Sequence, residues 1–401
     1  MSPKTGLVYS DEYLKHDTGN HPENSKRLEA ILSLLKEKNV LKYLTFINPR
    51  KADLKEIEYI HSPSYIQEVR EICQGGGGFL DSDTPVSSES FEVALLAAGG
   101  VFSAIDRVVA RKVTFGDHVP TPWSARDGLY GVDDLDSAFC LIRPPGHHAL
   151  REKGMGFCVF NNVALGAKYA QNKHHLKKVL IIDWDVHHGN GTQEAFWHDP
   201  SVLYFSVHQY PHYPGTGNIK EIGEGEGEGY TVNLPLPPRC GDEDYVYIFK
   251  EILLPIAKEF KPDITFVSAG FDAHRDDPLG GMSLTFQGYG VLTSLVKGFS
   301  KSIVSCLEGG YNLKALSESV LAHLDSLASR PEGTRGPRGK EFNFFSKGKI
   351  DGEPSKDVSP VRSKSPMATA SDKYRRTSNG VKEIVKKIKG IHSNYWSFNE
   401  E

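Results

Sequence analysis

The segment VLIIDWDVHHGNGT, residues 179–192, decides the fold, because it changes from an apolar run to alternating polar residues within a few positions. Four consecutive apolar residues at its start are typical of a parallel strand that is buried on both faces. Asp183, Asp185 and His187 follow at alternate positions, so an extended chain turns all three to one side. Two carboxylates and an imidazole are costly to desolvate together unless a cation lies among them. The segment therefore predicts either a metal ion or an ion-pair network at the carboxyl end of a strand.

Other parts of the chain repeat this apolar, strand-like character. They are residues 138–142, 202–207, 264–268 and 303–307. Segments with helical periodicity, such as residues 161–171 and 245–260, lie between them. This alternation predicts an α/β fold with an open, mostly parallel sheet and helices on both faces. Such folds place their functional sites in the loops after the carboxyl ends of the strands.

A third candidate metal ligand follows another of these strands. Asp272 lies in ITFVSAGFDAH, residues 264–274, where Gly270 is expected to allow a tight turn. Together with Asp185 and His187 it gives two carboxylates and one imidazole. Three protein ligands leave a position for water and substrate, which is typical of a catalytic rather than a structural zinc site.

Two adjacent histidines follow a Pro-Pro-Gly turn in IRPPGHHA, residues 142–149. His147 and His148 suit a general base and a general acid if nearby groups set their protonation. Asp183 is the natural partner of one ring. Asn190 offers the other ring an uncharged acceptor, which raises the pKa of that histidine less than a carboxylate would. In LEGGYN, residues 307–312, Tyr311 suits either a donor to a developing oxyanion or an ordinary turn tyrosine.

The last part of the chain differs in composition. Residues 331–378 are rich in Pro, Ser, Gly and Lys, which predicts a mobile insertion after a catalytic domain of residues 1–330. Residues 379–401 predict an amphipathic helix that docks on the body, because apolar residues from Val381 to Ile391 share one face. Its lysines are interpreted as solvated, with nucleic-acid binding as the alternative.

Composition restricts the compartment and the partners. The N-terminus has no apolar leader region, and the sequence has no uninterrupted apolar stretch of the about 18 residues that a membrane helix needs. The expected location is the cytoplasm, or the nucleus if the source has one, with no membrane contact. The five cysteines are scattered and are expected to be buried thiols. Residues 1–330 have a net charge of −10, which suits a cationic partner such as a lysine-rich protein segment.

These motifs together resemble the histone deacetylase superfamily, in particular its class II-like branch with bacterial and archaeal amidohydrolases and acetylpolyamine deacetylases. The resemblance covers roughly residues 5–325 and a terminal YW-containing helix. Besides the segments above it rests on HPENSKRL (21–28), DSDTPVSSESF (81–91), GFCVFNNVA (156–164), YFSVHQYPHYPGTG (204–217), GYTVNLPL (229–236) and SAGFDAHRDDPLGG (268–281). The chain departs from the family in an extra stretch at about residues 113–136, which touches no motif and could alter the rim of the site.

The resemblance implies an arginase/deacetylase-like fold and assigns roles to residues. Asp185, His187 and Asp272 would hold one catalytic zinc ion, and Tyr311 would stabilise the transition state. It also implies that Asp183 partners His147 and that Asn190 partners His148. The residues implied in substrate binding are Gly156, Phe157 and Tyr213 along an acyl-lysine tunnel, with Asp83 and Leu279 at its mouth. One or two structural potassium ions are implied at two sets of residues, namely Asp183, Asp185, His187 and Ser206, and Phe196, Asp199, Val202 and Tyr230.

The expected activity is hydrolysis of Nε-acetyl-lysine in a protein or peptide to lysine and acetate by a zinc-dependent amide hydrolase. One alternative is a small-molecule amidohydrolase of the acetylpolyamine type, but Leu279 stands where such relatives carry Glu. The other is a non-catalytic acyl-lysine binder, in which Tyr311 is often replaced by His. Direct nucleic-acid binding is not expected, and the sequence is compatible with a monomer or an oligomer.

Overall fold

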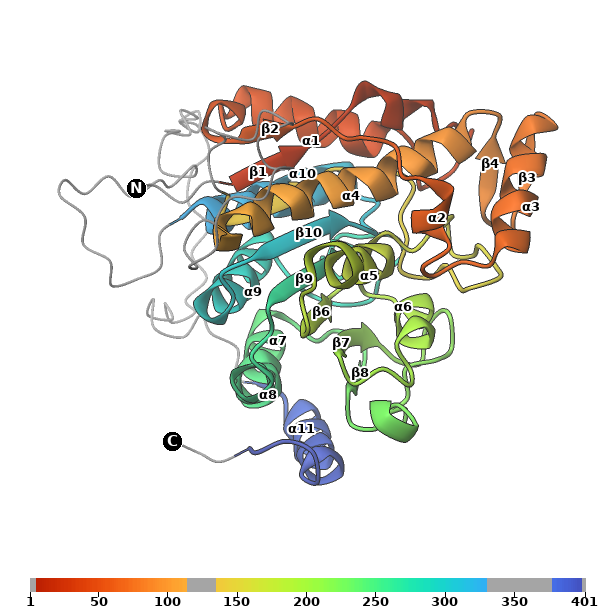
Figure 1. Ribbon diagram of the computed structural model, residues 1–401. Helices are drawn as coiled ribbons and strands as arrows, with labels where there is room; N and C mark the ends of the chain where they lie inside the picture. The colour runs from red at the N-terminus through yellow and green to blue at the C-terminus, as the bar shows by residue number, and fades with distance from the viewer. Residues whose placement is uncertain (1–4, 114–134, 330–376, 399–401) are drawn as a thin grey trace, which may run out of the picture.

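The computed structural model describes residues 5–113, 135–329 and 377–398. An eight-stranded sheet forms its centre, with the strand order β2-β1-β5-β10-β9-β6-β7-β8 (Figure 1). All pairs of neighbouring strands in it are parallel. The strands are β1 (Thr5–Val8), β2 (Thr45–Ile47), β5 (Ser137–Cys140), β6 (Val179–Asp183), β7 (Val202–Gln209), β8 (Thr231–Leu236), β9 (Ile264–Ala269) and β10 (Ile303–Leu307). A separate antiparallel hairpin pairs β3 (Gly77–Phe79) with β4 (Pro85–Ser87).

The five segments expected to be strands are all in the sheet, and the predicted α/β class is confirmed. Three further strands, β1, β2 and β8, were not expected from the sequence. The first two are only four and three residues long, which is too short for a periodic signal. The third contains Pro235, which lacks a backbone N–H, and this residue is tolerated because β8 lies at the edge of the sheet.

Helices cover both faces of the sheet. Helices α4 and α5 pack together on one face, and α1, α9 and α10 pack together on the other (Figure 1). The helices are α1 (Lys26–Glu37), α2 (Leu54–Ile57), α3 (Pro63–Gln74), α4 (Ser90–Val113), α5 (Asn162–His174), α6 (Asn190–Ala195), α7 (Asp242–Ile248), α8 (Leu254–Phe260), α9 (Phe286–Phe299), α10 (Leu313–Ala328) and α11 (Asn379–His392).

One helix, residues Ser90–Ala110 of α4, is long and apolar enough to cross a membrane by length and composition. It is not an uninterrupted apolar stretch, because it contains Glu92, Asp106 and Arg107. However, 78% of the most apolar window is buried inside the molecule, where α4 packs on α5 and the sheet. We therefore interpret α4 as a core helix, since a buried helix is apolar on all sides for the same physical reason as a membrane helix.

The single helix expected at residues 245–260 begins earlier and is interrupted. It starts at Asp242, and a π-helical turn from Phe249 to Leu253 separates α7 from α8. Pro255 lies just after this turn. Because proline has no N–H to donate to the carbonyl four residues earlier, the local hydrogen-bond pattern must change there.

The C-terminal helix α11 lies against the edge strand β8. Val381, Val385 and Ile388 are buried on its inner side, while Ile384 and Ile391 are only half-buried. Just beyond the helix, Trp396 is buried and its Nε1–H donates to the Gly229 carbonyl at 2.8 Å. Most of residues 331–378 and of residues 113–136 lie outside the described residues, so the predictions for these two segments stay predictions.

Candidate metal centre and active site

Five adjacent strands carry the candidate site at their carboxyl ends. These are β5, β10, β9, β6 and β7, which are consecutive in the sheet although they are not consecutive in the chain. The loop after β5 carries His147 and His148, and the loop after β10 carries Tyr311. Because parallel strands end on the same side of a sheet, these loops meet those that carry the three candidate metal ligands.

Asp185, His187 and Asp272 converge to form the candidate metal group. One ligand-type atom from each residue lies within 4.8 Å of the other two. Nδ1 of His187 is 3.0 Å from Asp185 Oδ1 and 3.3 Å from Asp272 Oδ2. The remaining carboxylate oxygens are fixed by the backbone, because Asp185 Oδ2 accepts from Gly309 N and Asp272 Oδ1 accepts from Val186 N, each at 2.8 Å.

The charges of this group fit a bound cation. Asp272 Oδ2 is buried and has no hydrogen-bond partner among the residues that the structure describes. Burial, reinforced by the nearby Asp185 carboxylate, raises the pKa of Asp272 to about 7. Burial lowers the pKa of His187, but its contacts with both carboxylates outweigh burial and raise the pKa to about 10. Two carboxylates and one imidazole, partly open to a cavity, are a donor set that suits zinc.

Glycines make room for these carboxylates. A Cβ atom at Gly270 would collide with the Asp185 carboxylate, and one at Gly309 would collide with the Asp272 carboxylate. Gly270 does not share the positive φ of Gly310, which is 118°, and the tight turn expected at Gly270 stays a prediction. Glycine is required at 270 for space and at 310 for backbone conformation.

The two histidines have different partners. Nδ1 of His147 donates to Asp183 Oδ2 at 3.0 Å, and Nδ1 of His148 donates to Asn190 Oδ1 at 2.7 Å. Burial lowers the pKa of His147, but Asp183 and Asp185 outweigh it and raise the pKa to about 10. Burial lowers the pKa of His148 well below its usual range, and the neighbouring imidazoles lower it further. The His147 ring therefore holds its proton strongly, whereas the His148 ring stays neutral.

Tyr311 is held in place by contacts of its backbone and of its ring. Its N–H donates to Asp277 Oδ2 at 2.6 Å. The Arg27 guanidinium carbon lies 5.0 Å from the centre of its ring, and the Phe157 ring meets it edge-on at 5.8 Å. Burial raises the pKa of the Tyr311 phenol well above its usual range, so the phenol keeps its proton and can donate a hydrogen bond.

A cavity of about 280 Å³ connects these groups to the surface. All five predicted substrate-binding residues line it, and so do the histidine pair, His187 and Tyr311. Its mouth contains Asp83, whose side chain is 73% exposed, and Tyr213, which is 42% exposed. Leu279 is half-buried there, and its carbonyl accepts from His212 Nε2 at 3.0 Å.

The His148 ring leaves no room for a side chain at Gly156. A Cβ atom at Gly156 would collide with the His148 ring, and its φ of 57° also favours glycine. The next residue, Phe157, has a φ of 72° and donates its N–H to Thr84 Oγ1 at 3.0 Å. The two residues therefore shape one wall of the cavity.

The residues of the two predicted potassium sets lie in or close to β6, β7, β8 and the end of α6. Asp183 and Ser206 are direct neighbours in the register of β6 and β7. In the other set, the Asp199 carboxylate accepts from Lys168 Nζ at 2.6 Å and from Ser201 Oγ at 2.5 Å. A cation there would therefore use backbone carbonyl oxygens, and both ions stay predictions.

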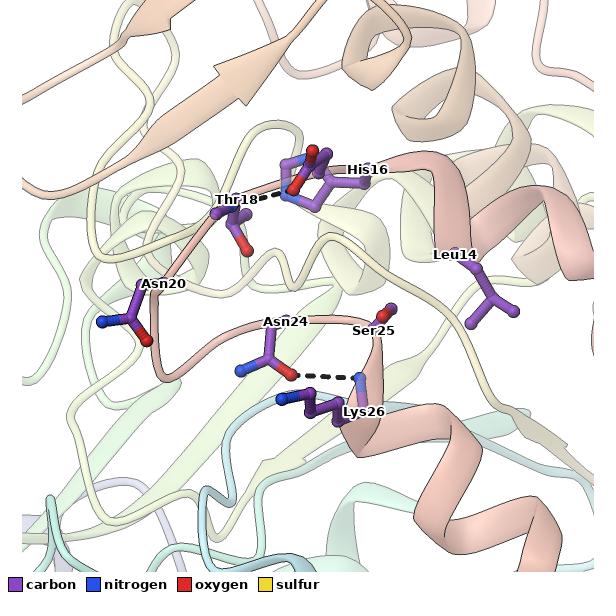
Figure 2. A pocket seen from close by; sticks show the side chains of 9 residues that line it. Leu14, His16, Thr18, Asn20, Asn24, Ser25 and Lys26 are labelled. Carbon is purple, nitrogen blue, oxygen red and sulfur yellow. Dashed lines mark hydrogen bonds between the residues drawn. The ribbon is translucent and has the colours of Figure 1, made fainter.

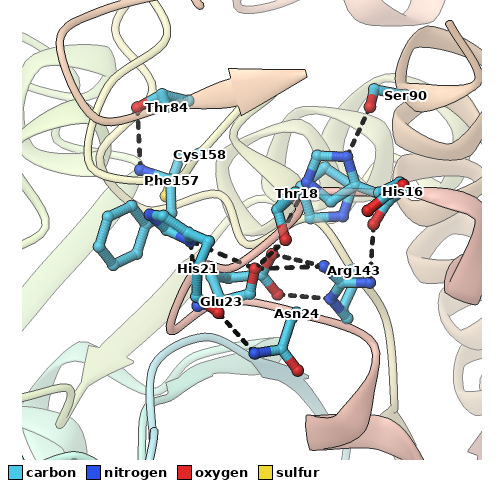
Figure 3. Close-up of polar contacts among 12 residues, drawn as sticks. His16, Thr18, His21, Glu23, Asn24, Thr84, Ser90, Arg143, Phe157 and Cys158 are labelled. Carbon is cyan, nitrogen blue, oxygen red and sulfur yellow. Dashed lines mark hydrogen bonds and ion pairs between the residues drawn. The ribbon is translucent and has the colours of Figure 1, made fainter. Parts of the chain in front are cut away.

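Two buried charged groups support the site, although no role was expected for them from the sequence. Glu308 accepts hydrogen bonds from the backbone of Gly146 and His147. The Glu23 carboxylate accepts from Arg143 Nη2 at 2.7 Å (Figure 3) and from Arg27 Nη1 at 3.1 Å. These residues belong to motifs that were quoted above, but their burial and partners could be seen only in the folded chain.

A second, smaller cavity of about 130 Å³ lies between the loop at residues 16–20 and the start of α1 (Figure 2). Polar side chains such as His16, Asn20 and Lys26 line it. None of the predicted site residues lines this cavity, and we therefore assign the candidate site to the larger one.

Comparison with known proteins places this arrangement in a family. The family model described as the histone deacetylase domain matches residues 21–327, and the chain belongs to this family. It is 41% identical to "Histone deacetylase 14, chloroplastic" of Arabidopsis thaliana over an alignment of 348 positions, which covers 80% of this chain and 78% of that protein. It is 38% identical to a "Probable deacetylase" of Archaeoglobus fulgidus over an alignment of 318 positions, which covers 77% of this chain and 82% of that protein.

A solved structure confirms the fold assignment. The crystal structure of the HDA15 HD domain matches with a TM-score of 0.79 and 31% sequence identity, and covers 99% of this chain and 96% of that chain. The deacetylase fold is therefore established. Membership of the family supports a deacetylase activity.

Proposed function

We propose that this protein is a zinc-dependent deacetylase that hydrolyses Nε-acetyl-lysine in proteins or peptides to lysine and acetate. The observation that carries the proposal is the convergence of the metal group, the two differently paired histidines and Tyr311 around one cavity. We also propose one or two potassium ions and a cytoplasmic or nuclear location.

Each residue has a distinct task in amide hydrolysis. Asp185, His187 and Asp272 would hold the zinc ion, which supplies Lewis-acid activation of water and of the acetyl carbonyl. The histidine pair takes a proton from the attacking water and returns a proton to the amine as the carbon–nitrogen bond breaks. The phenol of Tyr311 donates to the carbonyl oxygen while negative charge develops on it.

The mouth of the cavity favours a peptide. Leu279 is neutral and offers no counter-charge to a second ammonium group on a polyamine. The exposed Asp83 carboxylate can accept the backbone N–H of a peptide substrate. A small amine remains the second candidate, because Asp81 also lies at the mouth and the two carboxylates could bind an ammonium group.

The test compares kcat/KM for an acetyl-lysine peptide with that for N-acetylputrescine. We expect the peptide to be the better substrate, and we expect Tyr311→Phe to lower kcat by roughly 100- to 1000-fold. As a matched control, Tyr59→Phe alters a tyrosine on the surface and should have no effect. A preference for N-acetylputrescine would establish the small-amine reading, while peptide binding without any hydrolysis would establish a non-catalytic binder.

A further inference from the structure

A second set of ligand-type side chains lies beside the candidate zinc group. His147, Cys158 and Glu308 each offer one ligand-type atom within 4.8 Å of the other two. All three residues are buried. This set contains a sulfur, a nitrogen and an oxygen donor, and the mechanism above uses only His147.

Glu308 contributes an unpaired oxygen to this set. Its Oε2 accepts from Gly146 N at 2.7 Å and from His147 N at 3.2 Å. Its Oε1 is buried without a hydrogen-bond partner among the described residues. A carboxylate oxygen that is buried without a partner is unfavourable, so it favours a proton, a water molecule or a cation beside it.

Cys158 contributes the sulfur and can be reached from outside. It is buried in the protein, but it lines the 280 Å³ cavity together with His147. Its thiol lies 3.4 Å from the Gly156 carbonyl oxygen. An ion that enters through the mouth of the cavity therefore meets the sulfur and the imidazole at the same wall.

The geometry points to a second metal site, formed by His147, Cys158 and Glu308, that binds zinc or cadmium in excess of the first ion. Nδ1 of His147 is occupied by Asp183, so Nε2 is the nitrogen that would bind. The thiol proton and the proton on Nε2 of His147 pass to solvent as the metal–sulfur and metal–nitrogen bonds form. Mixed sulfur, nitrogen and oxygen ligands are typical of zinc, and a thiolate also selects soft ions such as cadmium.

This site should be weaker than the first one. Ligand atoms around tetrahedral zinc are about 3.5 Å apart, as follows from the usual metal–ligand distances. The ligand atoms of the set lie within 4.8 Å of one another, so any pair wider than about 3.5 Å must close up. Cys158 must also release a proton, although burial and Glu308 raise the pKa of its thiol. Occupation removes the free nitrogen of His147 from proton transfer and fills the base of the cavity. Zinc should activate at one equivalent and inhibit in excess.

The first test measures binding without substrate. Protein that carries one zinc per chain is titrated with Cd²⁺, and the ultraviolet cadmium–thiolate absorption is recorded together with the zinc that is released. We expect the absorption in the wild type and in Cys73→Ala, a matched variant at a buried cysteine on α3, but not in Cys158→Ala. Equal absorption in Cys158→Ala, or zinc released in step with cadmium uptake without thiolate absorption, would overturn the second site.

The second test measures inhibition as the ratio of rates with and without excess Zn²⁺, within each variant. In Cys158→Ala the concentration for half-inhibition should rise about 10-fold or more, because losing a ligand costs at least as much as losing a residue that supports one. Glu308→Gln, which keeps the shape but removes the charge, should also weaken inhibition. Unchanged half-inhibition in both variants contradicts the site. If the protein proves not to be a deacetylase, the cadmium titration still shows whether the second metal site exists.

Discussion

At the scale of single residues, the partner of each titratable side chain decides its task. His147 and His148 are adjacent in the chain, yet one donates to a carboxylate and the other to an amide. The carboxylate stabilises the protonated ring, whereas the amide adds no charge. Two imidazoles with the same intrinsic chemistry thereby differ in proton affinity within one site.

Removal of a candidate ligand should release the metal. We expect Asp272→Ala to give a folded protein that has lost most of its zinc and its activity, because two protein ligands hold the ion poorly. Zinc is measured per chain by elemental analysis, and folding by circular dichroism. Asp276→Ala, in the same loop with a side chain that is 65% exposed, is the control and should keep its zinc. Near-stoichiometric zinc in Asp272→Ala would contradict the assignment.

A charge at the mouth should change the choice of substrate. Leu279→Glu adds a carboxylate beside the cavity, which attracts the second ammonium of an N-acetylpolyamine more strongly than it affects a peptide. We expect the ratio of kcat/KM for the peptide to that for N-acetylputrescine to fall in the variant. Leu279→Gln, of similar size but neutral, is the control. An unchanged ratio in Leu279→Glu would mean that Leu279 does not set the preference.

At the scale of elements, the helix α11 closes the edge of the sheet. Edge strands expose unpaired backbone groups, and natural proteins often cover them with a helix or loop. Here the buried side of α11 packs on β8, and Lys389 pairs with Glu251 at 2.6 Å. The lysines on the other side, such as Lys386, are exposed.

The contact of Trp396 should contribute measurably to stability. Its indole is buried and donates to Gly229, so Trp396→Ala removes both apolar packing and a hydrogen bond. We expect the free energy of unfolding to fall by about 3 kcal/mol. Urea unfolding measures the change, and Lys386→Ala on the exposed side of α11 should change it by less than about 0.5 kcal/mol. An effect of Trp396→Ala as small as that of the control would show that α11 docks only weakly.

At the scale of the whole molecule, a buried charge cluster joins distant segments. Glu23 binds Arg143 from the loop that carries the histidine pair (Figure 3), and it binds Arg27 from α1. Arg27 Nε in turn donates to the Gly310 carbonyl at 2.7 Å, next to Tyr311. The cluster therefore sets the distance between two loops of the site.

Removal of the negative charge should destabilise the whole fold. Glu23→Gln leaves two buried guanidinium groups without their carboxylate, and we expect the free energy of unfolding at pH 7 to fall by about 3 kcal/mol. Glu12→Gln is the control, because Glu12 forms an exposed pair with Lys15. Equal unfolding midpoints for Glu23→Gln and the wild type would refute this role.

The difference in the free energy of unfolding between the wild type and Glu23→Gln should depend on pH in a defined direction. Burial raises the pKa of Glu23, but the two guanidinium groups outweigh burial and lower the pKa from 4.5 to about 2. The stabilisation is therefore complete above the unfolded pKa, and it is lost as the pH falls from 4.5 through about 2. The difference between wild type and Glu23→Gln should narrow below pH 4.5, which acid unfolding series of both proteins would measure.

The sequence by itself determined the strand ends and the chemical groups on them. The apolar run before Asp183 and the alternation of Asp183, Asp185 and His187 lie within nine residues, so local periodicity is enough to recognise them. Local pattern also indicated the α/β class and the C-terminal helix. The short strands β1 and β2 carried too few residues for such a signal.

Only the tertiary structure decided which of these groups meet. Asp272 approaches His187 because β9 pairs with β6, and Tyr311 faces them because β10 pairs with β9. Strand order depends on long-range packing, and periodicity within one segment carries no information about it. For the same reason the contacts of Glu308 with the His147 backbone, across more than 160 residues of chain, became visible only in the fold.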